Sequence, residues 1–156
     1  MQRKYHTKKV LFPDGSHLRI GIVAAEFHPD ITGRMLDGAL NALRQCGVKK
    51  GNIKVLRVPG SFEVPFGCLK LLNKRRAFDA LVALGCIVKG ETNHDHYIAS
   101  AVSEGIMDLS LAHSVPIGFG IITANTLAQA NARSTGNMNR GKDAALAAVE
   151  MAILKS

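Results

Sequence analysis

The stretch ALVALGCIV, residues 80–88, contains no polar side chain. An apolar run of this length is typical of a strand that is buried on both faces, as strands are in a parallel sheet covered by helices. Further runs, mostly apolar and rich in branched aliphatic residues, lie at residues 18–25, 53–58 and 115–123. The sequence therefore predicts four strands that are near-continuously apolar.

Segments with apolar residues at helical spacing follow each of these strands. They cover residues 31–46, 64–74, 94–112, 125–133 and 141–154. Because strands and helices alternate along the chain, we expect an α/β fold in which helices cover both faces of a mainly parallel four-stranded sheet. No sequence repeat or linker divides this pattern.

Length and composition indicate one folded domain. The chain has 156 residues, of which 47% are hydrophobic and 21% charged, close to the average of globular proteins. Pro13 follows a short apolar segment at residues 10–12 and is incompatible with a central strand. We therefore expect an N-terminal arm or edge strand over residues 1–17 and a single domain over residues 18–156.

Several features favour a cytoplasmic protein. No apolar run approaches the ~18 residues that a membrane span needs, so we expect no membrane contact. The basic N-terminus is not followed by the apolar stretch of a secretory signal. The three cysteines, Cys46, Cys68 and Cys86, are odd in number and widely spaced. This pattern fits buried thiols in a reducing compartment better than disulfides or a metal site.

The charge balance points to an anionic partner. The chain carries 20 Lys and Arg against 12 Asp and Glu, a net charge of +8. Nucleic acids attract basic proteins, but here the basic residues are dispersed, and aromatic residues for base stacking amount to only 5% with no Trp. A small anionic ligand is therefore a better prediction than a nucleic acid.

Polar residues follow three of the predicted strands directly, at residues 26–29, 59–63 and 89–94. In open parallel sheets ligands bind beyond the carboxyl ends of the strands, so we expect these three loops to lie side by side and form a site. They combine aromatic, carboxylate, hydroxyl, lysine and histidine side chains. These groups can support proton transfer and the binding of a polar ligand, but they do not define the reaction.

Individual residues of these loops have a functional and a structural interpretation. Phe27 suits the flat wall of a ring-binding site, or simple packing at a strand end. Ser61 can mark a place where a ligand approaches the backbone at a helix N-terminus, or it can be an ordinary helix cap. Glu63 can complement the helix dipole, and Thr92 can cap a helix or bind phosphate. His94 is the best candidate for proton transfer, because its ordinary pKa lies near neutrality.

Other kinds of chemistry have little support in the sequence. His94 and His96 are two residues apart on a predicted helix, so their side chains diverge and make a poor metal pair. Cys86 lies within an apolar strand and is more consistent with a structural thiol than with a nucleophile. Arg133 and Arg140 at helix ends offer a fork for phosphate, or simply favourable charges near helix termini.

At these residues the sequence resembles the lumazine synthase family over nearly the whole chain, residues 19–154. The motifs VPGSFEVP at 58–65 and GCIVKGETNH at 85–94 carry the resemblance most specifically. Further matches are AAEFH at 24–28, PIGFGIIT at 116–123 and NRG at 139–141. The resemblance implies a flavodoxin-like, three-layer αβα sandwich. It also implies condensation of 5-amino-6-(D-ribitylamino)uracil with 3,4-dihydroxy-2-butanone 4-phosphate, with no metal or organic cofactor.

The resemblance further implies a role for each matching residue. Phe27 would stack on the pyrimidine ring, His94 would transfer protons and Arg133 would bind the leaving phosphate. The other pocket residues it implies are Ser61 and Glu63 for the ribityl chain, Ile87 and Val88 for the uracil edge, and Glu91 and Thr92 on the phosphate side, with Phe62 and Lys89 beside them. Phe119 and Arg140 would reach the site of a neighbouring subunit, since family members form pentamers or shells of pentamers.

The sequence departs from the family pattern at a few positions. Asp95 and His96 follow His94 where the family usually has an aromatic residue and then an acid, and Arg140 stands where many members have Lys. Residues 134–140 are about one residue shorter than in shell-forming members, which favours a pentamer or decamer, and residues 8–12 are suited to adding a strand to a neighbour. A lumazine- or flavin-binding paralogue without turnover is the alternative function. A structural shell protein is a weaker one.

Overall fold

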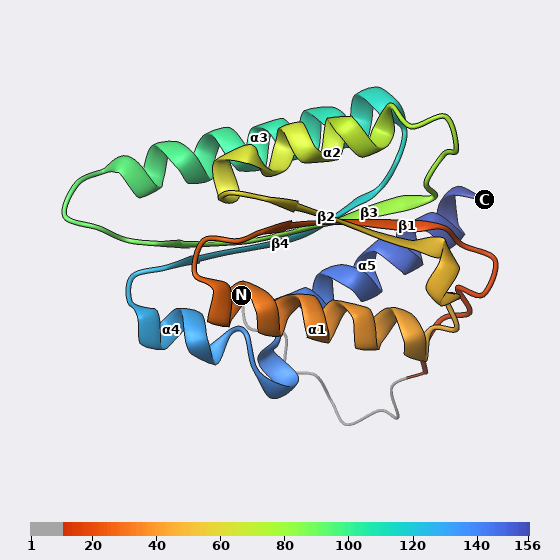
Figure 1. Cartoon of the computed structure of the whole chain (residues 1–156), viewed down its shortest axis with the longest axis horizontal. Coiled ribbons are helices and arrows are strands. Elements are labelled where there is room, and N and C mark those ends of the chain that lie inside the picture. The colour runs from red at the N-terminus through yellow and green to blue at the C-terminus, as the bar shows by residue number, and fades with distance from the viewer. Residues whose placement is uncertain (1–10) are drawn as a thin grey trace.

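Helices cover both faces of a four-stranded sheet in the computed structural model, which describes residues 11–156 (Figure 1). The strands are β1 (Ile20–Ala25), β2 (Ile53–Val58), β3 (Ala80–Val88) and β4 (Ile117–Ala124). The helices are α1 (Pro29–Gln45), α2 (Val64–Leu72), α3 (His94–His113), α4 (Leu127–Ala132) and α5 (Arg140–Lys155). Three short 3-10 turns complete the elements of the described residues: η1 (Lys50–Asn52), η2 (Ser61–Glu63) and η3 (Gly136–Met138).

The four strands are all parallel and lie in the order β2-β1-β3-β4. β1 and β2 end together, where Ala25 pairs with Val58, and Ala24 pairs with Leu84 of β3. β3 and β4 continue beyond this level and end together, where Val88 pairs with Ala124. The α/β class predicted from the alternating pattern is confirmed, and the helices form the outer layers of an αβα sandwich.

The sheet separates two apolar cores. One core packs α1 and α5 against one face, around residues such as Ile22 and Leu84. The other packs α2 and α3 against the opposite face, around Val23 and Leu81. Figure 1 shows α2 and α3 on one side of the sheet and α1, α4 and α5 on the other. Since alternate residues of a strand face opposite sides, burial on both sides explains why the central strands β1 and β3 are apolar throughout. The edge strands β2 and β4 are only partly buried, and β2 carries the exposed Lys54 and Arg57.

The element boundaries agree closely with the sequence patterns. β2 and β3 cover the predicted residues, and α1 begins at Pro29 because the fixed backbone of proline suits the first turn of a helix. β4 begins at Ile117 rather than at residue 115, because the Val115 N–H donates back to the Ser110 carbonyl at the end of α3. Among the helices of residues 11–156, none has both the length and the apolar character that a membrane crossing requires.

The predicted N-terminal arm or edge strand lies largely outside the described residues, as does most of the segment 8–12 proposed to pair with a neighbour. Within the described part, Leu11 and Phe12 belong to no strand. Phe12 packs against the core on the α1 and α5 side, whereas Leu11 is exposed. The N-terminal arm or edge strand over residues 1–17 therefore stays a prediction.

Two glycines allow α5 to lie very close to its neighbours. A Cβ at Gly141 would collide with the Met35 carbonyl of α1, and a Cβ at Gly118 would collide with the Ala144 carbonyl of α5. Any side chain at either position would push α5 away from the sheet or from α1. The tight contact between these layers therefore depends on glycine.

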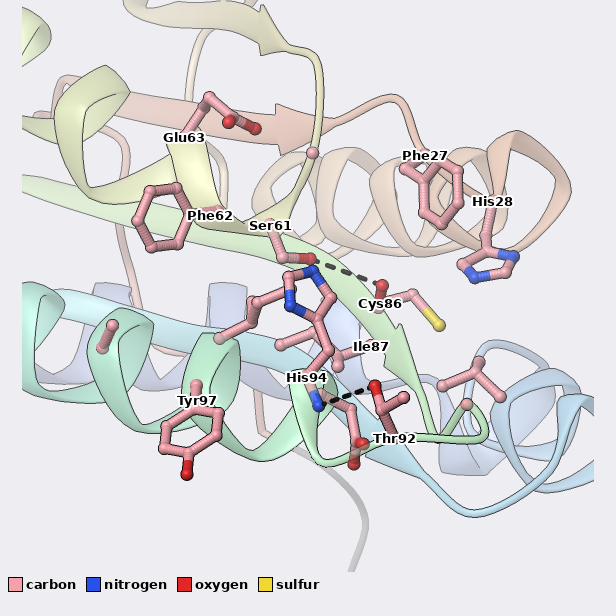
Figure 2. Close-up of a pocket in the computed structure, with 16 residues that line it drawn as sticks. Phe27, His28, Ser61, Phe62, Glu63, Cys86, Ile87, Thr92, His94 and Tyr97 are labelled. Carbon is pink, nitrogen blue, oxygen red and sulfur yellow. Dashed lines mark hydrogen bonds between the residues drawn. The ribbon is translucent and has the colours of Figure 1, made fainter.

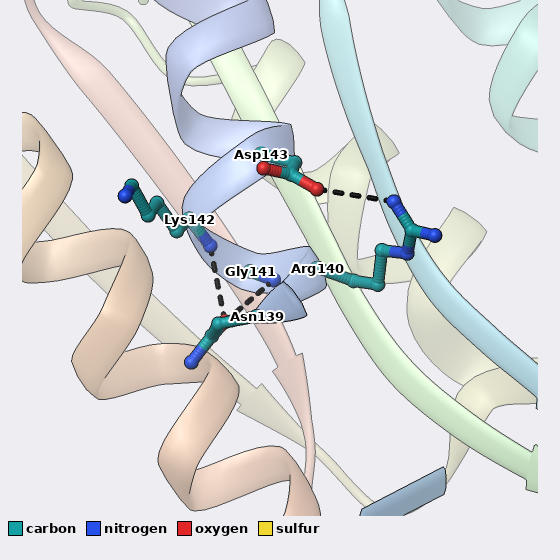
Figure 3. Close-up of polar contacts among 5 residues, drawn as sticks. All are labelled: Asn139, Arg140, Gly141, Lys142 and Asp143. Carbon is teal, nitrogen blue, oxygen red and sulfur yellow. Dashed lines mark hydrogen bonds and ion pairs between the residues drawn. The ribbon is translucent and has the colours of Figure 1, made fainter. Parts of the chain in front are cut away.

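Asn139 connects α5 to the rest of this layer through four hydrogen bonds, of which Figure 3 shows the two to Gly141 and Lys142. Its Oδ1 accepts from the backbone N–H groups of Gly141 (2.9 Å) and Lys142 (3.1 Å), which caps the helix. Its Nδ2 donates to the carbonyls of Arg34 in α1 (3.0 Å) and Ser134 (2.9 Å). Because Asn139 is only 7% exposed, water cannot easily replace these partners.

Asn139→Asp should destabilise the protein, because it keeps the cap acceptor but removes both Nδ2 donors and places a carboxylate against two carbonyls. Loss of buried hydrogen bonds of this kind costs about 2–3 kcal/mol. For a chain of this size we expect Tm to fall by roughly 5–10 °C. Thermal unfolding followed by circular dichroism measures the change. Asn41→Asp, on the exposed face of α1, is the control and should leave Tm nearly unchanged.

Candidate active site

A cavity of about 820 Å³ opens at the carboxyl edge of the sheet (Figure 2). It lies where the strand order changes direction, since β1 leads to β2 on one side and the chain then returns to β3 on the other. Such a switch point is where open parallel sheets bind ligands. Eight of the predicted site residues line the cavity: Phe27, Ser61, Phe62, Glu63, Ile87, Val88, Thr92 and His94.

Backbone hydrogen bonds beyond the strand ends hold the surrounding loops together. The Glu26 N–H donates to the Val58 carbonyl (2.8 Å), and the Phe27 N–H donates to the Pro59 carbonyl (3.0 Å). On the other side, the Lys89 N–H donates to the Ala124 carbonyl (2.8 Å). The ladder of the sheet thus continues into the loops, which places the loops after β1 and β2 side by side as predicted.

Phe27 and His28 form one side of the cavity. The Phe27 ring is 65% exposed, so it is a flat apolar surface without a covering partner in the described chain. The His28 imidazole stands edge-to-face against it, with ring centroids 4.6 Å apart and planes at 60°. Sequence reasoning missed His28 by treating it as one of several scattered histidines. The sequence signal that could have assigned His28 to the site is its position next to Phe27, in the loop that directly follows a buried strand.

Ser61 and Glu63 belong to η2, which enters α2 at the end of β2. Ser61 is only 6% exposed, and its hydroxyl donates to the Cys86 carbonyl at 3.4 Å. Ser61 therefore contacts β3, and the Glu63 carboxylate remains exposed to solvent at the cavity. Burial raises the pKa of the Cys86 thiol to about 11, so this group stays protonated near neutral pH and fits a structural role.

His94 and Thr92 lie at the start of α3. The His94 backbone N–H donates to the Thr92 hydroxyl at 3.4 Å, so Thr92 helps to begin the helix while it also lines the cavity. The exposed His94 side chain contributes to the same cavity. His96 lines neither cavity described here and packs near Tyr97, with ring centroids 5.8 Å apart. Within residues 11–156, no three His, Cys, Asp or Glu side chains gather to hold a metal ion.

A smaller, more polar cavity of about 290 Å³ adjoins the first. It contains Arg133 at the end of α4 together with Gln129, and the Arg133 guanidinium donates to the Gln129 carbonyl at 3.1 Å. Ile87 and Asp95 line both cavities, so the two are neighbours. Besides Arg133 and Ile87, the sequence interpretation assigned none of the residues of this cavity to binding: Asp95, Ala99, Thr123, Ala124, Asn125 and Gln129.

Four predicted residues line neither cavity. Lys89 and Glu91 lie in the loop between β3 and α3 but do not reach the cavity wall. Phe119 is about half exposed on the edge strand β4. Arg140 forms an ion pair with Asp143 at 3.1 Å (Figure 3). Phe119 and Arg140 were expected to act at a neighbouring subunit, so their positions within one chain leave that prediction open.

Comparison with known proteins gives consistent matches over this fold. A family model described as 6,7-dimethyl-8-ribityllumazine synthase matches residues 17–156. A 6,7-dimethyl-8-ribityllumazine synthase of Parabacteroides distasonis is 45% identical over 140 residues, which cover 89% of this chain and 87% of the relative. A protein of the same name from Christiangramia forsetii is 39% identical over 94% of this chain and 88% of its own length. The chain therefore belongs to the 6,7-dimethyl-8-ribityllumazine synthase family.

Proposed function

We propose that the larger cavity is where this chain makes 6,7-dimethyl-8-ribityllumazine, with the phosphate of the second substrate held in the smaller one. The observation that carries this assignment is the pairing of the two cavities at the switch point of the sheet. One offers an apolar wall with an imidazole, and the other offers an arginine. A binding protein without turnover is the less favoured alternative, because the relatives reported above are named as synthases.

The larger cavity suits 5-amino-6-(D-ribitylamino)uracil. The exposed face of Phe27 can stack on a planar pyrimidine. Ile87 and Val88 lie at the end of β3, where the strand backbone offers fixed N–H and C=O groups to the edge of the ring. Ser61 and Glu63 supply a helix-entry backbone and a carboxylate, which can hydrogen-bond the hydroxyls of a ribityl chain.

The smaller cavity suits the phosphate of 3,4-dihydroxy-2-butanone 4-phosphate. A guanidinium binds phosphate through parallel N–H donors, and the amides of Gln129 and Asn125 add neutral donors beside Arg133. Asp95 shares both cavities and is half-buried, so its carboxylate would disfavour an anion placed against it. We therefore place the phosphate toward Arg133 and the ketone toward the larger cavity.

The chemistry then requires only proton transfers and a fixed orientation. The 5-amino group attacks the ketone and loses water to form an imine, which tautomerises and expels phosphate. The resulting enol becomes a ketone, the ribitylamino nitrogen attacks it, and a second water leaves as the ring closes. His94 can carry protons between these atoms, and the cavity holds the two substrates in contact.

His94→Ala should slow turnover by about 10²-fold without abolishing it, because proton transfer is one contribution and orientation remains. Lumazine fluorescence and phosphate release measure the rate from the two substrates. His96→Ala is the matched control, since His96 lies two residues away and outside both cavities, and it should keep wild-type activity. Equal losses in both variants would contradict the role of His94.

Arg133→Ala should raise KM for the butanone phosphate by about 10- to 100-fold, since hydrogen bonds to charged groups contribute ~1.5–3 kcal/mol. KM for the ribitylaminouracil should change little. The KM of Arg133→Lys for the butanone phosphate should lie between those of Arg133→Ala and wild type, because lysine keeps the positive charge but lacks the two parallel N–H donors of the guanidinium. Arg44→Ala, at the exposed end of α1, is the control for a general change in charge. An unchanged KM in Arg133→Ala would overturn the assignment.

We also propose that the chain assembles into pentamers or pairs of pentamers, with sites shared between subunits. The outer surfaces of α2 and α3 expose large apolar side chains: Phe66 is 68%, Met107 58% and Leu111 71% exposed. In α3 only Val102 and Ile106 are buried, although the helix has 20 residues. An exposed apolar surface of this kind is typical of a subunit interface. A cytoplasmic location is proposed on the three buried, unpaired cysteines.

Leu111→Lys should dissociate the assembly, because it places a charge in the proposed apolar interface while costing little in the single chain. Sedimentation should show wild-type particles of several chains and smaller particles for the variant. Leu154→Lys, at an equally exposed position at the end of α5 on the opposite layer, is the control and should leave the mass unchanged. A wild-type protein that sediments at 16.7 kDa would refute the proposal.

A further inference from the structure

His28 holds a left-handed backbone conformation, which few residues other than glycine adopt, although histidine adopts it more often than most. Its φ and ψ are 57° and 62°, in the left-handed region, and it is followed by Pro29. Side chains with a Cβ are disfavoured there, and proline pushes the preceding residue toward extended backbone. Among the residues that the structure describes, only His28 and Ser114 are non-glycine residues with positive φ.

The start of α1 does not require a histidine at this position. The His28 carbonyl accepts from the backbone N–H groups of Ile31 and Thr32, both at 3.0 Å, and from the Thr32 hydroxyl at 3.2 Å. Any residue would supply that carbonyl, and the His28 side chain makes no capping hydrogen bond. Glycine or asparagine would adopt this backbone more easily. The structural role therefore leaves the imidazole unexplained.

The imidazole lies at the cavity instead. His28 is half-buried and lines the cavity together with Phe27, against which its ring stands edge-to-face. Figure 2 shows His28 and Phe27 together on one side of the cavity and His94 on the other. An unfavourable backbone that is retained beside a binding cavity indicates that the side chain it presents has a function there.

We propose that the His28 imidazole hydrogen-bonds the polar edge of the pyrimidine and so sets its rotation on the Phe27 ring. This inference rests on the proposed function, in which Phe27 stacks on that pyrimidine. Stacking fixes the plane of a ring but leaves it free to turn within the plane, so a second contact at the edge is needed to aim the 5-amino group. A neutral imidazole has one N–H donor and one acceptor, and a uracil edge offers both complementary groups.

His28→Gly tests this inference, because glycine relieves the backbone while removing the imidazole. We expect the Kd for 6,7-dimethyl-8-ribityllumazine, measured by its fluorescence, to rise about tenfold, as for loss of one hydrogen bond. KM for the ribitylaminouracil should rise similarly and KM for the butanone phosphate should stay unchanged. His28→Asn should recover most of the affinity, since its amide has a donor and an acceptor and suits left-handed backbone.

Ser114→Gly is the matched control, because Ser114 shares the left-handed backbone, with φ 53°, but lies outside both cavities at the end of α3. It should leave Kd and both KM values unchanged. A His28→Gly protein with wild-type Kd and KM, or with both KM values raised equally, would overturn the inference alone. Wild-type protein that neither binds nor makes the lumazine would overturn the proposed function and this inference with it.

Discussion

The hydrogen-bonded register between β1 and its two neighbours holds the rest of the structure in place. Because all strands are parallel, the loops that follow them lie at the same edge of the sheet, although β3 and β4 continue a few residues beyond the ends of β1 and β2. The backbone bonds from Glu26 to Val58 and from Phe27 to Pro59 extend this register beyond the strands. The cavity is thus built on hydrogen-bonded backbone, and fixed backbone is what precise orientation of two substrates requires.

The second layer depends on α5 lying unusually close to α1 and β4. Gly118 and Gly141 permit the approach, and the buried Asn139 hydrogen-bonds Arg34 of α1, Ser134 after α4 and the start of α5. The same region is joined to the smaller cavity, since the Arg140 N–H donates to the Arg133 carbonyl at 2.9 Å. The packing of α5 therefore helps to position Arg133, the proposed phosphate-binding residue, although Arg133 lies at the end of α4.

Much of the candidate site followed from local patterns and from the family resemblance. Phe27, Ser61 and His94 each lie within a few residues of the end of a predicted strand, and such positions can be recognised from the sequence alone. His28 and Asp95 were not assigned to the site, because their importance comes from backbone conformation and from the adjacency of two cavities. Neither property has a periodic signal in the sequence.

The sequence by itself determined the element types, the parallel sheet covered on both faces and the family, because burial on both sides leaves an unbroken apolar run and the motifs lie beside those runs. Only the tertiary structure decided the strand order β2-β1-β3-β4, and with it the position of the cavity at the switch between β1 and β3. It also separated Lys89 and Glu91 from the cavity wall that their neighbours line. The physical reason is that strand order and side-chain direction depend on contacts between segments far apart in the chain, which local periodicity does not encode.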